Sequence, residues 1–144
     1  MERNFEERVR TGFKKQGFMT AIGGELVEVQ PGFCRIHLPY SEKVAQQHGF
    51  FHGGVISALA DNAAGFAGYS LMNSDQQPLS VEFKINFLAP AVGDTLEARG
   101  RVIRSGYRIK HVNVEIFALD QGNEQLVAVA LATIASSTGV QEIS

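Results

Sequence analysis

Apolar residues along this chain recur at helical spacing in two regions and alternate with polar residues elsewhere. Phe5, Val9 and Phe13 lie about one helical turn apart with charged residues between them, which predicts a short amphipathic helix that Gly17 ends. Residues 53–69 are apolar or small on nearly every side. This pattern predicts a helix of about five turns that other elements surround.

The other stretches have strand character. Residues 21–29 and 33–40 flank a Gln-Pro-Gly turn and predict a hairpin. Residues 78–90 alternate apolar Val81, Phe83, Ile85 and Phe87 with polar Ser80, Glu82, Lys84 and Asn86, the pattern of a half-buried strand. Three more strands are predicted over residues 94–106, 108–120 and 125–137. The order of these predicted helices and strands along the chain predicts an α+β fold in which a curled antiparallel sheet surrounds one central helix.

Composition limits the classes of protein to which the chain can belong. Its 144 residues, 44% hydrophobic, predict a single domain over residues 1–144. A net charge of -2 argues against nucleic acid or an anionic membrane as a partner, and no run of residues is typical of a secretory signal or a membrane span. The single cysteine, Cys34, and the absence of zinc-like Cys/His spacing indicate a cytoplasmic protein without a structural metal, with Cys34 as a small core residue.

One acid, Asp61, stands inside the apolar helix. Burying an unpaired carboxylate costs several kcal/mol or raises its pKa, so Asp61 needs either hydrogen-bond partners or a reactive role. A structural carboxylate bonded to neighbouring backbone or to Asn62 and a carboxylate facing a cavity both fit the pattern.

His52, Gly53 and Gly54 stand at the start of the same helix. Backbone N–H groups there carry partial positive charge, and glycine lets a ligand approach the backbone closely. Gly53 and Gly54 are therefore candidates for binding a substrate carbonyl as it becomes an oxyanion. The alternative is that the two glycines only form a tight turn.

The segment HGFFHGGVISALAD, residues 48–61, resembles the signature of hotdog-fold acyl-CoA thioesterases, particularly the phenylacetate-degradation type. NFLAPAVGD, residues 86–94, resembles the strand end and loop of the same family. The order of the predicted helices and strands also agrees with that of the family over most of the chain. The resemblance implies the hotdog fold, with a sheet wrapped around one helix, and hydrolysis of an acyl-CoA thioester without metal or cofactor.

The resemblance also implies a role for individual residues. Asp61 would act as general base or nucleophile, and the Gly53 N–H would polarise the carbonyl. Gln46 falls where the family has an Asn or Gln that positions the carbonyl, and His52 where a histidine orients the site. One branch of the family has a Thr one turn after the acid that holds the attacking water. Gly65 occupies that position here and has no hydroxyl group, so the role of holding the water would rest on Ser80.

The segment RVIRSGYRIKH, residues 101–111, supplies candidate contacts for the coenzyme. Arg104, Gly106 and Arg108 fit phosphate recognition, because arginine offers a fork of donors and the turn offers backbone amides. The alternative is a solvated hairpin. The family implies a homodimer, or a homotetramer of paired dimers, with Asp61 of one chain facing Gly53 of the partner subunit.

Two other functions remain open. A hotdog dehydratase acting on hydroxyacyl thioesters would use His52 with Asp61 for proton transfer. A non-catalytic acyl-CoA binding module would use the same fold without chemistry. The acyl group is undetermined, because the aromatic residues that could line a pocket could equally form the core: Phe50, Phe51, Phe66, Tyr69, Phe83 and Phe87.

Overall fold

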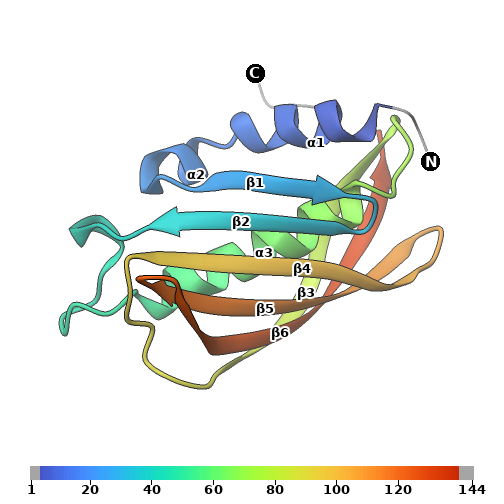
Figure 1. Cartoon of the computed structure of the whole chain (residues 1–144). Coiled ribbons are helices and arrows are strands. Elements are labelled where there is room, and N and C mark those ends of the chain that lie inside the picture. Colours follow the sequence, from blue (N-terminus) through green and yellow to red (C-terminus); the bar gives the residue numbers. More distant parts are fainter. Residues whose placement is uncertain (1–3, 140–144) are drawn as a thin grey trace.

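The computed structural model describes residues 4–139, in which six antiparallel strands form one sheet that curls around a long helix (Figure 1). The helices are α1 (Phe5–Lys14), α2 (Gly17–Ile22) and α3 (Gly53–Tyr69), with a short 3-10 turn at Glu42–Val44. The strands are β1 (Glu25–Gln30), β2 (Phe33–Pro39), β3 (Gln76–Phe87), β4 (Thr95–Ser105), β5 (Ile109–Asp120) and β6 (Asn123–Thr138). Their order in the sheet, β1-β2-β4-β5-β6-β3, leaves β1 and β3 at the edges. The predicted α+β architecture is confirmed.

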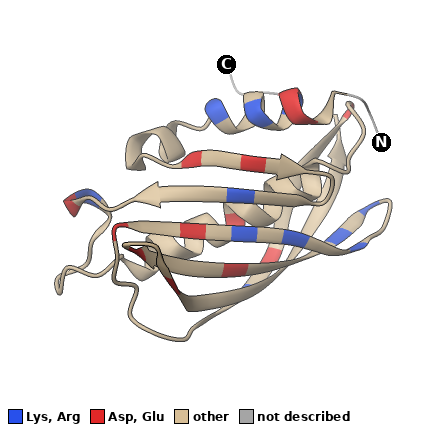
Figure 2. Ribbon diagram, viewed as in Figure 1, with Lys and Arg blue, Asp and Glu red and all other residues tan. Residues whose placement is uncertain are grey.

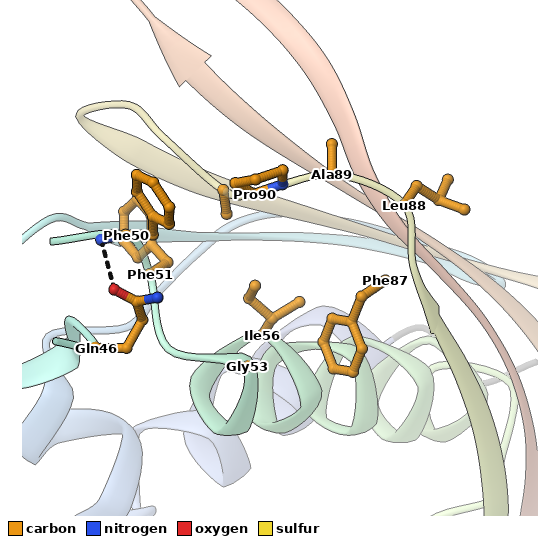
Figure 3. A pocket seen from close by; sticks show the side chains of 10 residues that line it. Gln46, Phe50, Phe51, Gly53, Ile56, Phe87, Leu88, Ala89 and Pro90 are labelled. Carbon is orange, nitrogen blue, oxygen red and sulfur yellow. Dashed lines mark hydrogen bonds between the residues drawn. The ribbon is translucent and has the colours of Figure 1, made fainter. Parts of the chain in front are cut away.

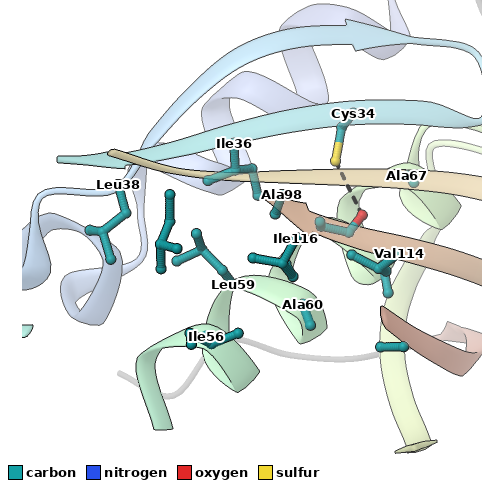
Figure 4. Close-up of a cluster of buried hydrophobic side chains, with 14 of the residues drawn as sticks. Cys34, Ile36, Leu38, Ile56, Leu59, Ala60, Ala67, Ala98, Val114 and Ile116 are labelled. Carbon is teal, nitrogen blue, oxygen red and sulfur yellow. Dashed lines mark hydrogen bonds between the residues drawn. The ribbon is translucent and has the colours of Figure 1, made fainter. Parts of the chain in front are cut away.

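The core lies between α3 and the inner face of the sheet (Figure 4). Leu59, Ala63 and Ala67 of the helix are fully buried against inward-facing strand residues such as Ile36 and Ile116. Small residues let the two layers approach closely: a Cβ on Gly100 of β4 would lie 2.5 Å from the Ala63 carbonyl oxygen. The apolar character of residues 53–69 therefore reflects burial of α3 by the sheet.

Cys34 lies in this core, as predicted. Its thiol is fully buried and lies 3.1 Å from the Ala63 carbonyl oxygen, to which it donates. Burial raises the pKa of the Cys34 thiol to about 12. A thiolate at this position is therefore disfavoured, and Cys34 is a packing residue.

The sequence-based prediction was wrong at Gly17. Gly17 does not end the first helix but begins α2, because the chain turns at Gln16, which has an extended backbone, and then becomes helical again. The glycine that ends a helix is Gly23, whose φ of 87° is the left-handed conformation that favours glycine. The first strand consequently begins at Glu25 and not at residue 21.

The edge strand β3 departs from simple alternation. Its pairing with β6 shifts between Ser80 and Glu82, so the intervening Val81 forms a bulge and is 59% exposed. Val81 was predicted on the apolar face and Ser80 on the polar face. The bulge reverses this locally, and Ser80 lies beside α3.

The N-terminal segment is attached to α3 at two places, its C-terminal end and its middle. The Arg8 guanidinium of α1 donates to the Tyr69 and Met72 carbonyl oxygens, a favourable position for a cation at a helix C-terminus. Gln16 and Asn62 form a reciprocal pair of side-chain amide hydrogen bonds. Over residues 4–139, no helix has the length and apolar character needed to cross a membrane.

Candidate active site

The N-terminus of α3 presents a backbone N–H group that is open to a ligand. His52 precedes the helix, and its Nδ1 accepts the Gly54 N–H at 2.8 Å, which caps the helix. Gly54 has to be small here, because a Cβ would lie 2.9 Å from His52 Nδ1. The Gly53 N–H has no acceptor within residues 4–139 and remains available.

Gln46 presents a second donor beside it. The Gln46 side-chain Oε1 accepts the backbone N–H groups of His48, at 2.5 Å, and Phe50, at 3.2 Å. These two donors determine which way the amide is turned, so its NH2 group is the free end. That group has no acceptor in the described part of the chain.

Gln46 and Gly53 both line a cavity of about 500 Å³ (Figure 3). The other lining residues are aromatic, aliphatic or proline, and come from the loop before α3, from α3 and from the segment after β3: Phe50, Phe51, Ile56, Phe87, Leu88, Ala89, Pro90 and Ala91. None of the lining side chains is charged. The two open donors therefore face a pocket whose walls are mostly apolar and carry no charged side chain.

The structure places the six aromatic candidates in three different surroundings. Phe50, Phe51 and Phe87 line the cavity, whereas Phe66 and Tyr69 pack beside Phe13 near the C-terminal end of α3. Phe83 packs against the core. Sequence reasoning could not separate these roles. It also missed Leu88 and Pro90, whose part in the cavity depends on how the chain leaves β3.

Asp61 lies on α3 beside the edge strand. Ser80 Oγ donates to Asp61 Oδ1 at 2.5 Å, and this bond is possible because the β3 bulge turns Ser80 toward the helix. Asp61 is partly buried, and within residues 4–139 its second oxygen has no partner. The helix rise places Asp61 about 12 Å along the axis from Gly53. The structure therefore brings Asp61 together with Ser80 but not with Gly53.

The β4–β5 hairpin lies at the other end of the sheet from the N-terminus of α3 (Figures 1 and 2). Arg104, Gly106 and Arg108 are exposed there, and neither arginine has a side-chain partner in the part of the chain that the structure describes. Lys110 supports the turn: its Nζ donates to the Gly106 carbonyl at 2.6 Å, and burial lowers the pKa of this amine. Lys110 also packs near Gly68, close to the C-terminal end of α3.

Glu97, a buried carboxylate, lies on the outer face of the sheet. Its oxygens contact His37 Nε2 at 2.6 Å and Arg99 at 2.5 Å, with Arg35 at 3.5 Å. Burial alone raises the pKa of Glu97, but the hydrogen bonds and positive charges of His37 and Arg99 together bring it below its ordinary value. In residues 4–139 no group of three or more acidic, His or Cys side chains is arranged to hold a metal.

Comparison with known proteins identifies the family. The thioesterase superfamily model matches residues 48–125, more than half of the chain. A 1,4-dihydroxy-2-naphthoyl-CoA hydrolase of Listeria monocytogenes is 30% identical over 119 residues, which cover 83% of this chain and 94% of that protein. The chain belongs to the thioesterase superfamily.

Solved structures show the same relationship. A thioesterase family protein from Silicibacter pomeroyi is 34% identical, with a TM-score of 0.92 over 94% of this chain and 99% of that one. The PaaI protein of the Escherichia coli phenylacetic acid degradation operon has a TM-score of 0.83 over 94% of this chain and 95% of its own, at 23% identity, which shows a shared fold. The predicted hotdog fold and resemblance are confirmed, and the protein is a thioester hydrolase.

Proposed function

We propose that this protein hydrolyses acyl-CoA thioesters at a site that begins at the N-terminus of α3. The observation that supports this most directly is the pair of open donors, the Gly53 N–H and the Gln46 amide, that line one apolar cavity. A thioester carbonyl needs such donors where its oxygen becomes negative during attack. The helix dipole adds partial positive charge at the same point.

Asp61 is the proposed base or nucleophile. As a base, its carboxylate takes a proton from water as the water oxygen bonds to the carbonyl carbon. The C–S bond then breaks, and coenzyme A leaves as a thiol with that proton. As a nucleophile, the carboxylate displaces coenzyme A and forms an anhydride that water hydrolyses. In either route Ser80 orients Asp61, and its oxygen can accept a hydrogen bond from the water.

The proposed site requires two copies of the chain. Gly53 and Asp61 lie about 12 Å apart along α3, whereas groups acting on one carbonyl lie about 3 Å from its atoms. The free edge of β3, beside which Asp61 lies, can pair with the same edge of a second copy around a two-fold axis. The two α3 helices would then run antiparallel, with Asp61 facing Gly53 of the partner subunit.

The same two-fold arrangement accounts for the separation between Gly53 and the β4–β5 hairpin. Reversing one chain relative to the other carries its hairpin toward the N-terminus of α3 in the partner subunit. Arg104, Gly106 and Arg108 would there meet the phosphates of coenzyme A. We therefore propose a homodimer as the minimal active unit, and a homotetramer of two such dimers preserves these contacts.

Product analysis tests the hydrolase function. The purified protein is incubated with an acyl-CoA and with a hydroxyacyl-CoA, and free thiol is measured together with any enoyl product. We expect thiol release from the acyl-CoA. Elimination of water without thiol release would support the dehydratase, and binding without either product would support the non-catalytic module.

Mixed dimers test the shared site. Asp61→Asn chains and Gln46→Ala chains with different affinity tags are co-expressed, and dimers carrying both tags are purified. One of the two sites then receives Asp61 and Gln46 intact, so activity well above either parent is expected. A wild-type chain paired with a chain carrying both Asp61→Asn and Gln46→Ala is the matched control, because a shared site would then have one half altered at each position and no intact site forms. Activity in this control, together with no gain over the parents in the first pairing, would place the whole site in one chain.

A further inference from the structure

The cavity beside Gly53 has a chemical character that constrains the substrate. Its volume of about 500 Å³ is within the ~300–1,000 Å³ typical of small-molecule pockets. Its walls are formed largely by phenylalanine, aliphatic and proline side chains, and none is charged. A carboxylate or ammonium group placed against these walls would lose part of its hydration without gaining a partner of opposite charge.

Phe87 forms one end of this cavity. In Figure 3 its ring lies against α3 at the end opposite Phe50 and Phe51. The ring Cζ lies 3.6 Å from the position that a Cβ on Gly53 would occupy. Phe87 is nevertheless 53% exposed, so the core does not depend on it as it does on fully buried residues.

The inner face of β3 continues beyond Phe87 along the helix. Ile85 and Phe83 follow on the same face and are partly buried against the core. The Phe87 ring therefore stands between the cavity and the α3–β3 contact that lies behind it. Removing the ring would extend the cavity in that direction.

We propose that the cavity binds the acyl group, that this group is uncharged and apolar, and that Phe87 is the specificity-determining residue that limits its length. The inference rests on the proposed hydrolysis at Gly53. A carbonyl oxygen bound to the Gly53 N–H places the first carbons of the acyl chain beside the Phe87 ring, which stabilises them by apolar contact. The ring blocks the path beyond it, so the additional carbons of a longer acyl group stay outside the cavity.

Two pairs of substrates test charge and length separately. Hexanoyl-CoA and adipoyl-CoA have the same number of acyl carbons, but adipoyl-CoA carries a terminal carboxylate. The wild-type protein is expected to hydrolyse hexanoyl-CoA with kcat/KM at least about 100-fold higher, because of the desolvation of that carboxylate. Hexanoyl-CoA and decanoyl-CoA differ only in length.

Variants at Phe87 test whether this residue limits the length of the acyl chain. Phe87→Ala is expected to raise the decanoyl/hexanoyl ratio of kcat/KM at least roughly tenfold, since the shorter side chain leaves room for about two further methylenes and each newly buried methylene contributes about fourfold. Phe87→Trp is expected to lower the ratio. Phe18→Ala is the matched control, because Phe18 is 58% exposed on α2 and does not line the cavity. Thermal unfolding of each variant checks that it is folded.

The contrary outcomes are distinct. Comparable hydrolysis of adipoyl-CoA and hexanoyl-CoA would overturn the exclusion of charge while leaving thioester hydrolysis intact. A Phe87→Ala protein whose activity changes by one common factor for all acyl lengths would overturn the role of Phe87. Thiol release from none of the substrates by folded wild-type protein would overturn the proposed function together with this inference.

Discussion

The two buried or partly buried carboxylates of this protein, Asp61 and Glu97, have opposite surroundings. The Glu97 side chain is only 4% exposed and is paired with His37, Arg99 and Arg35. Asp61 has one partner, the Ser80 hydroxyl, and an oxygen without a partner in the residues that the structure describes. Asp61 lies on an otherwise apolar helix and Glu97 on a strand that carries other charges, and the two carboxylates differ in burial and in partners.

The comparison indicates what each carboxylate is for. Both oxygens of Glu97 accept hydrogen bonds, one from His37 and one from Arg99, and the bond to His37 joins strands β2 and β4. The open oxygen of Asp61 can still accept a proton or attack a carbon. A buried acid with a full set of partners supports the fold, whereas one with an incomplete set is suited to chemistry.

The largest expected effect is on turnover, at Asp61. Asp61→Asn keeps the shape and the hydrogen bond to Ser80 but removes basicity and charge, so kcat for acyl-CoA should fall by about 100-fold or more. The midpoint of thermal unfolding should change little. Steady-state thiol release and a melting curve measure the two quantities, and near wild-type turnover in the folded variant would refute the role of Asp61.

Glu97→Gln should show the reverse pattern, with turnover retained and the free energy of unfolding reduced by about 2–3 kcal/mol. The pKa of Glu97 is lowered in the folded state, so its stabilising effect is present above the unfolded pKa of about 4.3 and is lost as pH falls through the folded value. The difference between wild type and variant in urea unfolding should therefore narrow below about pH 4.

Glu124→Gln is the matched control for this experiment. Glu124 is half-exposed and pairs with the same Arg99 at 2.6 Å. An exposed ion pair is worth about 0–1 kcal/mol, so the control should unfold nearly as wild type does. Equal losses in both variants would show that burial of Glu97 is not what makes its network stabilising.

The arginines extend the comparison to cations. Arg99 is held by Glu97 and Glu124, whereas Arg104 and Arg108 have no side-chain partner in residues 4–139. Arg104→Ala combined with Arg108→Ala should raise KM for acyl-CoA about tenfold with little change in kcat or stability, since phosphate contacts are equal in ground and transition states. An acyl-pantetheine, which lacks the nucleotide, should be unaffected. An equal loss with both substrates would assign the arginines to fold or assembly.

The smallest expected effect is at Ser80. Ser80→Ala removes the one partner of Asp61, and kcat should fall by about 3- to 10-fold, the value of a single hydrogen bond. Ser80→Thr keeps the hydroxyl and should retain more activity than Ser80→Ala. If the two variants lose activity equally, the hydroxyl does not orient Asp61.

Several features of the fold could be predicted because they depend on neighbours in the sequence. The burial of α3 follows from apolar residues on all its sides, and the hairpin of β1 and β2 follows from the turn at Pro31 and Gly32. The position of Gly53 at a helix start is likewise local. Gly17 could not be assigned in this way, because glycine both ends helices and permits a new one to begin.

Other features depend on contacts between distant segments, and only the tertiary structure decided them. The bulge at Val81, which turns Ser80 toward Asp61, comes from the register of β3 against β6. The Glu97 network joins residues brought side by side by strand pairing, and nothing in the alternation of β4 distinguishes Glu97 from an exposed acid. The periodicity of the sequence indicates on which face of a strand or helix a side chain lies. The residues that contact this side chain come from a neighbouring strand or helix, and they decide how much it stabilises the fold and what chemistry it can perform.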